Sequence, residues 1–396
     1  MLKRHRNFFH YALDCLKKYK TRTFVVLIAF TIAISMLSSI LFLKDGLERE
    51  AELSVSLAPD ITVSYLQGGR VLLLPSSYID KASEIKGVVR ALPRIWGYDG
   101  KGLNTYTVRG LDLSGVEVDY GFSNLVKKGR FLVPEDAGTG SIVIGELLAG
   151  VLKVDVGDTM ILLSESIEAN RFTVVGIFSS ETTIYTADLI VMPIDDARKF
   201  FKIPEGYVTD MIIYTDPEVP VDNVAAELST MPNARVLTKD ILLRGYKAAY
   251  GGRGGFLVTF WVILLSAVAL VCFSQATIVG RESMFEVGLL KTFGFTTLDI
   301  IEIRLIESLI LGVFSASLGM VIGIVYDIWF KAGIFAQSLL GWAFLPAEFH
   351  MPVYVSFPSV FSLYAVTVLP LLFATTVPAW LNAITDPELA MRRAAA

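Results

Sequence analysis

Side chains that commonly carry out catalysis or bind metals are scarce in this chain and poorly spaced. Its three histidines, His5, His10 and His350, do not have the spacing of zinc ligands. No Ser-His-Asp or Cys-His arrangement for nucleophilic hydrolysis can be assembled, and the phosphate-binding pattern Gly-x-x-x-x-Gly-Lys-Ser/Thr does not occur. The sequence therefore predicts no catalytic, metal or cofactor site, and it indicates a protein that is not an enzyme by itself.

The segment whose residue types best suit contact with another surface is 281–294. As a short helix it would place its apolar side chains Met284, Val287 and Leu290 on one face. Its other faces would carry the charged side chains Glu282, Glu286 and Lys291. Periodicity alone leaves two interpretations open, a helix that lies in the membrane interface and one that binds a protein partner.

Four long uncharged apolar runs, two before this segment and two after it, would fix its position. They are Phe24–Leu43, Phe256–Gly280, Ser308–Tyr326 and Met351–Thr385. A hydrocarbon core about 30 Å thick needs ~20 apolar residues in a helix, so each run is long enough to span a bilayer. We therefore predict an α-helical membrane protein with four transmembrane helices and a large polar segment between the first two.

Flanking charges predict the orientation of these runs. Residues 1–23 carry seven Lys or Arg side chains and one acidic residue, Asp14, an asymmetry that keeps a segment on the cytoplasmic side. Both termini are expected in the cytoplasm and the polar segment outside. A cleaved signal peptide is the alternative for the first run, although its apolar core would have only ~7–15 residues. Phe9, Leu13 and Leu16 share a face near the N-terminus, which indicates an interfacial helix on membrane lipids.

The polar segment has the pattern of an α+β domain. Strand-like stretches such as Ile61–Tyr65 alternate with short helical ones such as Ile194–Phe201. Strands expected at 142–144, 160–163 and 172–178 favour a β-rich subdomain, about residues 112–183, inserted into the α+β part. Residues 45–250 carry 29 acidic and 20 basic side chains, so nucleic acid is not an expected partner.

Small residues recur along one face of the third run. They are Gly312, Ser315, Gly319 and Gly323. Such residues allow helices to approach closely in lipid. The pattern leaves open whether the neighbour is another helix of this chain or a helix of a second subunit in a dimer.

Residues 281–294 resemble the signature of the FtsX/MacB-like ABC transporter permeases, of the MacB and LolC type. In that family an Arg-x-x-Glu-Ile-Gly-x-Leu-Lys/Arg-x-x-Gly string follows the second span, and this chain has the matching residues Glu286, Gly288, Leu290, Lys291 and Gly294. The stretches Val154–Thr159, Phe172–Phe178 and Pro378–Trp380 are also similar to the family. The chain departs from many relatives at Phe295–Asp299, where they have a small residue and basic positions.

The resemblance implies a non-catalytic permease subunit whose extracytoplasmic domain is porter-like, with the β-rich insertion. The string would be a coupling helix seated in a separate ATPase, formed by Arg281, Glu282, Glu286, Val287, Gly288, Leu290, Lys291 and Gly294. ATP and Mg²⁺ would be bound by an ABC ATPase subunit dimer, and the permease would form a homodimer or heterodimer with a second permease. Movement of the outer domain, or mechanotransmission, would export or extract a lipid, lipoprotein or other envelope substrate. A periplasmic adaptor or a lipoprotein is a further candidate partner.

The resemblance also implies a place in the cell inner membrane and a division of the chain. The expected segments are a cytoplasmic amphipathic helix at 1–23, transmembrane helices at 24–43, 253–280, 305–328 and 357–381, the MacB-like domain at 44–252, a coupling-helix loop at 281–304, an extracytoplasmic loop at 329–356 and a cytoplasmic tail at 382–396. The alternative function is a signalling or scaffold protein that activates an envelope partner such as a cell-wall hydrolase.

Overall fold

The computed structural model describes residues 2–56, 58–99, 106–113, 126–163, 169–179, 188–248, 284–333 and 351–384, with single positions between 259 and 273 and at 335. The chain divides into two compact units. The membrane unit comprises Met1–Leu47, Gly251–Leu340 and His350–Ala396. The sheet domain comprises Glu48–Tyr250 and Gly341–Phe349.

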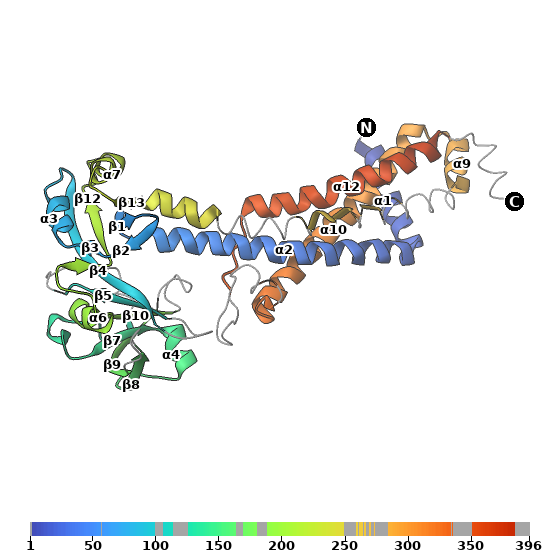
Figure 1. Ribbon diagram of the computed structural model, residues 1–396. Coiled ribbons are helices and arrows are strands. Elements are labelled where there is room, and N and C mark those ends of the chain that lie inside the picture. The colour runs from blue at the N-terminus through green and yellow to red at the C-terminus, as the bar shows by residue number, and fades with distance from the viewer. Residues whose placement is uncertain are drawn as a thin grey trace. The chain divides into compact units, whose positions relative to one another are not determined.

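Long helices dominate the described part of the membrane unit (Figure 1). They are α1 (Leu2–Lys18), α2 (Lys20–Ser56), α9 (Met284–Thr292), α10 (Thr297–Trp329) and α12 (Phe357–Ala383). Among the described residues, three helical segments are long and apolar enough to cross a membrane, namely Thr23–Ser56, Thr297–Trp329 and Phe357–Leu381. The predicted second span at 253–280 lies largely outside the described residues, so the total of four spans stays a prediction.

A sharp turn between α9 and α10 is fixed by local sequence. Gly294 adopts a φ of 87°, the left-handed conformation that ends a helix at little cost for glycine. Two residues later Thr296 caps α10: its hydroxyl accepts a hydrogen bond from the Asp299 amide at 3.3 Å, and the Asp299 carboxylate accepts one from the Thr296 amide at 2.9 Å. This reciprocal capping box satisfies amide groups that the first helical turn leaves unpaired.

Glycines bring the spanning helices close together. A Cβ added at Gly323 would lie 2.1 Å from Ser38 Oγ of α2, and one at Gly319 would lie 2.9 Å from Ile34 Cβ. Gly312 faces α12 instead, where an added Cβ would lie 3.2 Å from Val368 Cγ2. Ser315 is buried in the same stripe. The contacts of the three glycines are thus made within the chain.

The sheet domain is built on one mixed sheet, ordered β13-β1-β12-β4-β5-β10-β7-β9-β6, with β2 added to β1 and β8 to β9. Its strands are β1 (Ile61–Gln67), β2 (Arg70–Leu72), β4 (Val88–Asp99), β5 (Tyr106–Leu111), β6 (Val126–Gly129), β7 (Ser141–Gly145), β8 (Thr159–Leu163), β9 (Ala169–Phe178), β10 (Leu189–Pro193), β12 (Asp210–Thr215) and β13 (Ala234–Thr238). A separate pair joins β3 (Leu74–Pro75) to β11 (Tyr207–Val208). Its described helices include α3 (Ser77–Ser83), α4 (Glu146–Leu152), α6 (Ile194–Phe200) and α7 (Val221–Leu228), and residues 239–248 are also helical.

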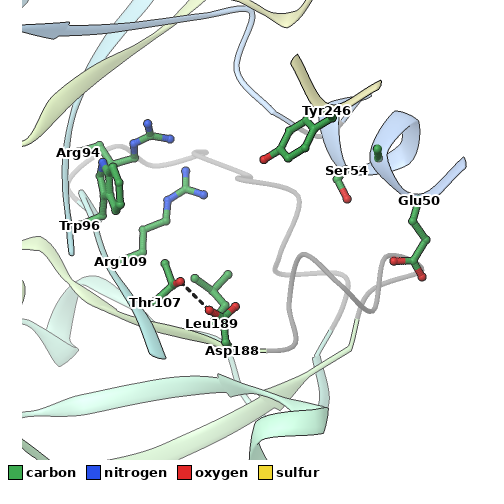
Figure 2. Close-up of a pocket in the computed structure, with 10 residues that line it drawn as sticks. Glu50, Ser54, Arg94, Trp96, Thr107, Arg109, Asp188, Leu189 and Tyr246 are labelled. Atoms are coloured by element: carbon green, nitrogen blue, oxygen red, sulfur yellow. Dashed lines mark hydrogen bonds between the residues drawn. The ribbon is translucent and has the colours of Figure 1, made fainter. Parts of the chain in front are cut away.

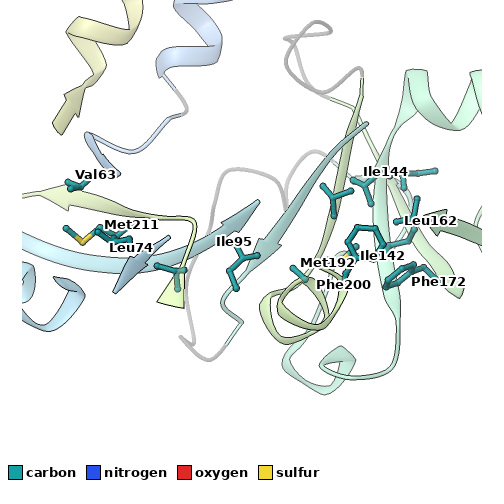
Figure 3. Packing of buried hydrophobic residues seen from close by; sticks show 14 of the residues in the cluster. Val63, Leu74, Ile95, Ile142, Ile144, Leu162, Phe172, Met192, Phe200 and Met211 are labelled. Carbon is teal, nitrogen blue, oxygen red and sulfur yellow. The ribbon is translucent and has the colours of Figure 1, made fainter. Parts of the chain in front are cut away.

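One long strand joins the two ends of this sheet. The first part of β4 pairs with β12 and its last five residues, from Ile95, pair with β5. Figure 3 shows the buried core following the sheet from Val63 and Met211, past Ile95, to Ile142 and Phe172. The strands predicted at 142–144, 160–163 and 172–178 are confirmed as parts of β7, β8 and β9. They continue the same sheet through β10 rather than forming a separate one.

The tight glycine contacts predict different losses of stability for three alanine variants. Gly323→Ala and Gly319→Ala should each destabilise the protein by about 1–3 kcal/mol, because the new methyl group overpacks the seam with α2. Gly312→Ala, with more room, should cost less and benefit from the higher helix propensity of alanine, which is worth up to about 1 kcal/mol. Thermal unfolding of the purified protein in detergent measures the order. Equal midpoints for the three variants would contradict the packing described here.

Candidate functional site

Glu286 of α9 lies against the junction between α1 and α2. Lys18 Nζ donates a hydrogen bond to Glu286 Oε1, and the Tyr19 hydroxyl donates to the same oxygen at 2.8 Å. The Glu286 side chain is 19% exposed, whereas that of Lys18 is 63% exposed. The carboxylate is therefore largely enclosed while its cationic partner remains in contact with solvent.

These contacts keep Glu286 ionised. Burial alone would raise the pKa of Glu286, but the hydrogen bonds from Lys18 and Tyr19 outweigh it and hold the pKa below its ordinary value. The hydrogen bond to Glu286 correspondingly raises the pKa of Lys18. Nearby, burial raises the pKa of Tyr11 to about 12 and that of Cys15 to about 11, so both stay neutral at physiological pH. A neutral, buried thiol at Cys15 is a poor nucleophile.

Helix α1 is fastened along its length to the start of α10. Phe8, Ala12 and Cys15 are buried on one face, and Phe8 and Ala12 pack against Ile303. Arg4 donates to both carboxylate oxygens of Asp299 at 2.5 Å. The Phe9, Leu13 and Leu16 face predicted from the sequence is instead exposed or half-buried, as a face in contact with lipid would be.

The remaining residues of the predicted coupling helix divide between two environments. Arg281 and Glu282 lie outside the described residues. Val287 and Gly288 are buried, and Val287 packs against Ile300 of α10. The last members, Leu290 and Lys291, are half-buried, and Gly294 forms the turn. The face that sequence periodicity assigned to an external contact, which includes Val287 and Leu290, is thus turned inward.

A different apolar set is exposed at the same end of the molecule. Leu289, Phe293 and Leu298 are 42%, 74% and 76% exposed. Phe293, Gly294, Phe295 and Asp299 line a cavity of about 410 Å³ together with Arg4, Asn7, Phe8 and Tyr11 of α1. Sequence reasoning missed this set, because the turn after α9 had to be known before these side chains could be placed on one surface.

Two carboxylates fasten α2 to its neighbouring helices, and neither was singled out from the sequence. Ser39 donates a hydrogen bond to Asp327 of α10, which is 2% exposed. Asp45 accepts hydrogen bonds from Ser356 at 2.6 Å and Ser359 at 2.5 Å, at the start of α12. Their only signal in the sequence is a lone acidic residue at the end of an apolar run.

The sheet domain contains a second cavity, of about 370 Å³ (Figure 2). Figure 2 shows Arg94 and Trp96 of β4 beside Arg109 and Thr107 of β5, with Glu50, Ser54 and Tyr246 across the opening. Four of its polar side chains, Arg94, Trp96, Thr107 and Asp188, form side-chain hydrogen bonds. Arg94 forms two hydrogen bonds, of 2.7 and 2.6 Å, to Asp210, to which the Trp96 indole also donates at 2.8 Å.

Asp188 is the group in this cavity with a perturbed acidity. Burial raises the pKa of its carboxyl, and the hydrogen bond donated by Thr107 at 2.8 Å opposes the rise without cancelling it. In the part of the chain that the structure describes, no group of three or more His, Cys, Asp or Glu side chains is placed to hold a metal ion.

Comparison with known proteins identifies the family to which this architecture belongs. Residues 23–231, more than half of the chain, match the MacB-like periplasmic core domain family. The chain belongs to this family. The match begins at the start of the first span and ends just before β13, so it covers most of the sheet domain. The predicted FtsX/MacB-like family is thereby confirmed, whereas the coupling role of residues 281–294, which lie outside the match, stays a prediction.

Relatives of the MacB-like chain include transport proteins. It is 23% identical over 273 residues to the lipoprotein-releasing system transmembrane protein LolC of Xylella fastidiosa, covering 64% of this chain and 65% of LolC. It is 23% identical over 343 residues to an ABC transporter permease of Methanocaldococcus jannaschii, covering 79% of this chain and 82% of the relative. The chain thus spans just under two thirds of LolC. Among solved structures, the periplasmic region of MacB from Actinobacillus actinomycetemcomitans aligns at 12% identity with a TM-score of 0.35, covering 47% of this chain and 91% of that one.

Asp188 gives a pH-dependent prediction. Because its folded-state pKa lies above that of an exposed aspartate, about 3.9, its stabilising neutral form is lost as pH rises through the folded value. Asp188→Asn should therefore raise the thermal midpoint by a few degrees at pH 7, and the gain should vanish below pH ~4. The amide oxygen can still accept from Thr107.

The control is Asp222→Asn, an exposed carboxylate in the first turn of α7. Loss of this charge removes a favourable interaction with the helix dipole, so this variant should not be stabilised at any pH. A stability difference between Asp188→Asn and the unchanged chain that does not depend on pH would contradict the assignment.

Proposed function

We propose that this chain is the transmembrane permease subunit of an ABC transporter, in which a separate ATPase moves the coupling helix and so moves the periplasmic domain. Membership of the MacB-like family is the observation that carries the proposal. Relatives named as an ABC permease and as a lipoprotein-releasing transmembrane protein support it. The alternative of a signalling or scaffold protein is not favoured, because these relatives are transport proteins.

In this proposal the work is mechanical and the chemistry belongs to the partner. An ABC ATPase dimer binds ATP and Mg²⁺, and its closure displaces α9. The permease acts with a second permease, identical or not, and the moving periplasmic domain extracts or exports a lipid, lipoprotein or other envelope substrate. The LolC relatives favour a lipoprotein among these, and an adaptor would then receive it.

The ATPase would contact the exposed apolar surface formed by Leu289, Phe293 and Leu298. Large exposed apolar side chains are typical of a protein interface, and aromatic residues supply much of the binding energy of such contacts. The adjoining cavity between α1 and the turn after α9 would receive a side chain of the ATPase. The basic residues of α1 support a cytoplasmic location for this end, where an ATPase would reside.

The docking surface can be tested by charge substitution. Phe293→Asp and Leu298→Asp should each reduce co-purification of the ATPase at least about tenfold, because a hot-spot residue contributes about 2 kcal/mol or more. Phe293→Leu, which keeps an apolar side chain, is the matched control and should retain most of the binding. Quantitative pull-down from detergent-solubilised membranes measures the difference.

Binding that stays within about twofold in both aspartate variants would remove this surface from the interface. The apolar residues would then belong to a helix that lies in the membrane, the second interpretation left open by periodicity. Wild-type levels of the variants in the membrane fraction exclude misfolding as the cause of a loss.

A further inference from the structure

The acidic residue of the coupling helix faces the inside of the membrane unit. Glu286 contacts Lys18 and Tyr19, whereas Leu289 of the same helix is 42% exposed. The two sides of helix α9 therefore have different surroundings. The outer side is available to a partner, and the inner side contacts the α1–α2 junction at Lys18 and Tyr19.

That junction is a turn at Tyr19, and hydrogen bonds bridge it. The Tyr19 amide donates to the Cys15 carbonyl at 3.0 Å, and the Thr23 amide donates to the Tyr19 carbonyl at 3.0 Å. The Thr23 hydroxyl also donates to the Leu16 carbonyl at 3.0 Å. Figure 1 shows α1 turning away from the axis of α2 here. A displacement of Lys18 and Tyr19 would thus be carried into the first turn of α2 through these hydrogen bonds.

Helix α2 is the first spanning helix and runs without a break from Lys20 to Ser56, where it leads into the sheet domain. Along the backbone, α9 is joined to α2 only through the predicted second span and the sheet domain. The contacts of Glu286 with Lys18 and Tyr19 are therefore a direct path between the two helices.

We propose that Glu286 is a positioning residue that couples α9 to α2: when the ATPase displaces α9, the contacts of Glu286 with Lys18 and Tyr19 pull the α1–α2 junction with it. This inference rests on the proposed function, and it adds a route by which the movement enters the first span. The contacts of Glu286 suit tight coupling, because charge-assisted hydrogen bonds are directional and are broken by a small displacement.

Substitution of Lys18 by methionine and of Glu286 by glutamine separates this positioning role from ATPase binding. We use the permease with its ATPase in nanodiscs, with Ser56→Cys at the end of α2 as a reporter and Cys272→Ser to remove a competing thiol. The measurement is the difference in thiol labelling rate with and without ATP. Lys18→Met and Glu286→Gln should reduce this difference by about threefold to tenfold, while ATPase co-purification is retained.

Three controls make the result specific. Lys18→Arg keeps the charge and should keep the response. Lys17→Met alters the neighbouring lysine, whose partner is the exposed Asp14, and should change nothing. The double variant Lys18→Met with Glu286→Gln should be no worse than either single variant, because both remove one contact.

The outcomes distinguish this inference from the function on which it rests. A full response in Lys18→Met and Glu286→Gln, or additive losses in the double variant, would overturn the positioning role alone. Loss of ATPase co-purification in Glu286→Gln but not in Lys18→Met would also overturn it, because Glu286 would then belong to the docking surface. If no ATPase binds the unchanged chain, both this inference and the proposed function fail.

Discussion

The close approach of α2 to α10 is the constraint on which the rest of the membrane unit depends. In lipid, helices gain little from hydrophobic burial against each other, so they associate through close packing and a few polar contacts. Gly319 and Gly323 supply the close packing, and the Ser39 hydroxyl bound to Asp327 supplies a polar contact in the same seam. A larger residue at either glycine would separate the helices and leave the Asp327 carboxylate without its hydrogen-bond donor.

The sheet domain depends in a similar way on one long strand. Because β4 pairs with β12 in its first part and with β5 in its last, the two ends of the sheet share a backbone and cannot shift register independently. Ile95, fully buried, lies at the change of partner. In the proposed function this arrangement would help the domain to transmit movement, since strain at one end would be carried by a continuous hydrogen-bonded ladder.

Sequence reasoning succeeded where a pattern depends on local geometry. Alternation placed β7, β8 and β9, and apolar runs placed α2, α10 and α12, because burial on one face or on all faces leaves a direct trace in residue order. It failed where a side chain's role depends on a partner far along the chain. Periodicity put Val287 and Leu290 on one face of a helix but could not tell whether that face meets α10 or another protein. Asp327 and Tyr19 acquire their roles only from residues more than 200 positions away.

The difference between the exposed apolar side chains and the inner contacts of α9 has a physical reason. In the proposed function, Leu289 of α9, Phe293 of the following turn and Leu298 of α10 would bind through shape and area, which tolerates small rotations of the partner. The inner contact of Glu286 with two neighbouring donors is directional, so it fixes the register of α9 against the α1–α2 junction. Packing of Phe8 and Ala12 on α10 could not set that register by itself, because apolar helix faces can slide past each other at small cost. In the proposed function, α9 would be pushed through the exposed apolar side chain of Leu289 and would pull through the directional contacts of Glu286 on its inner side, where Val287 packs against Ile300.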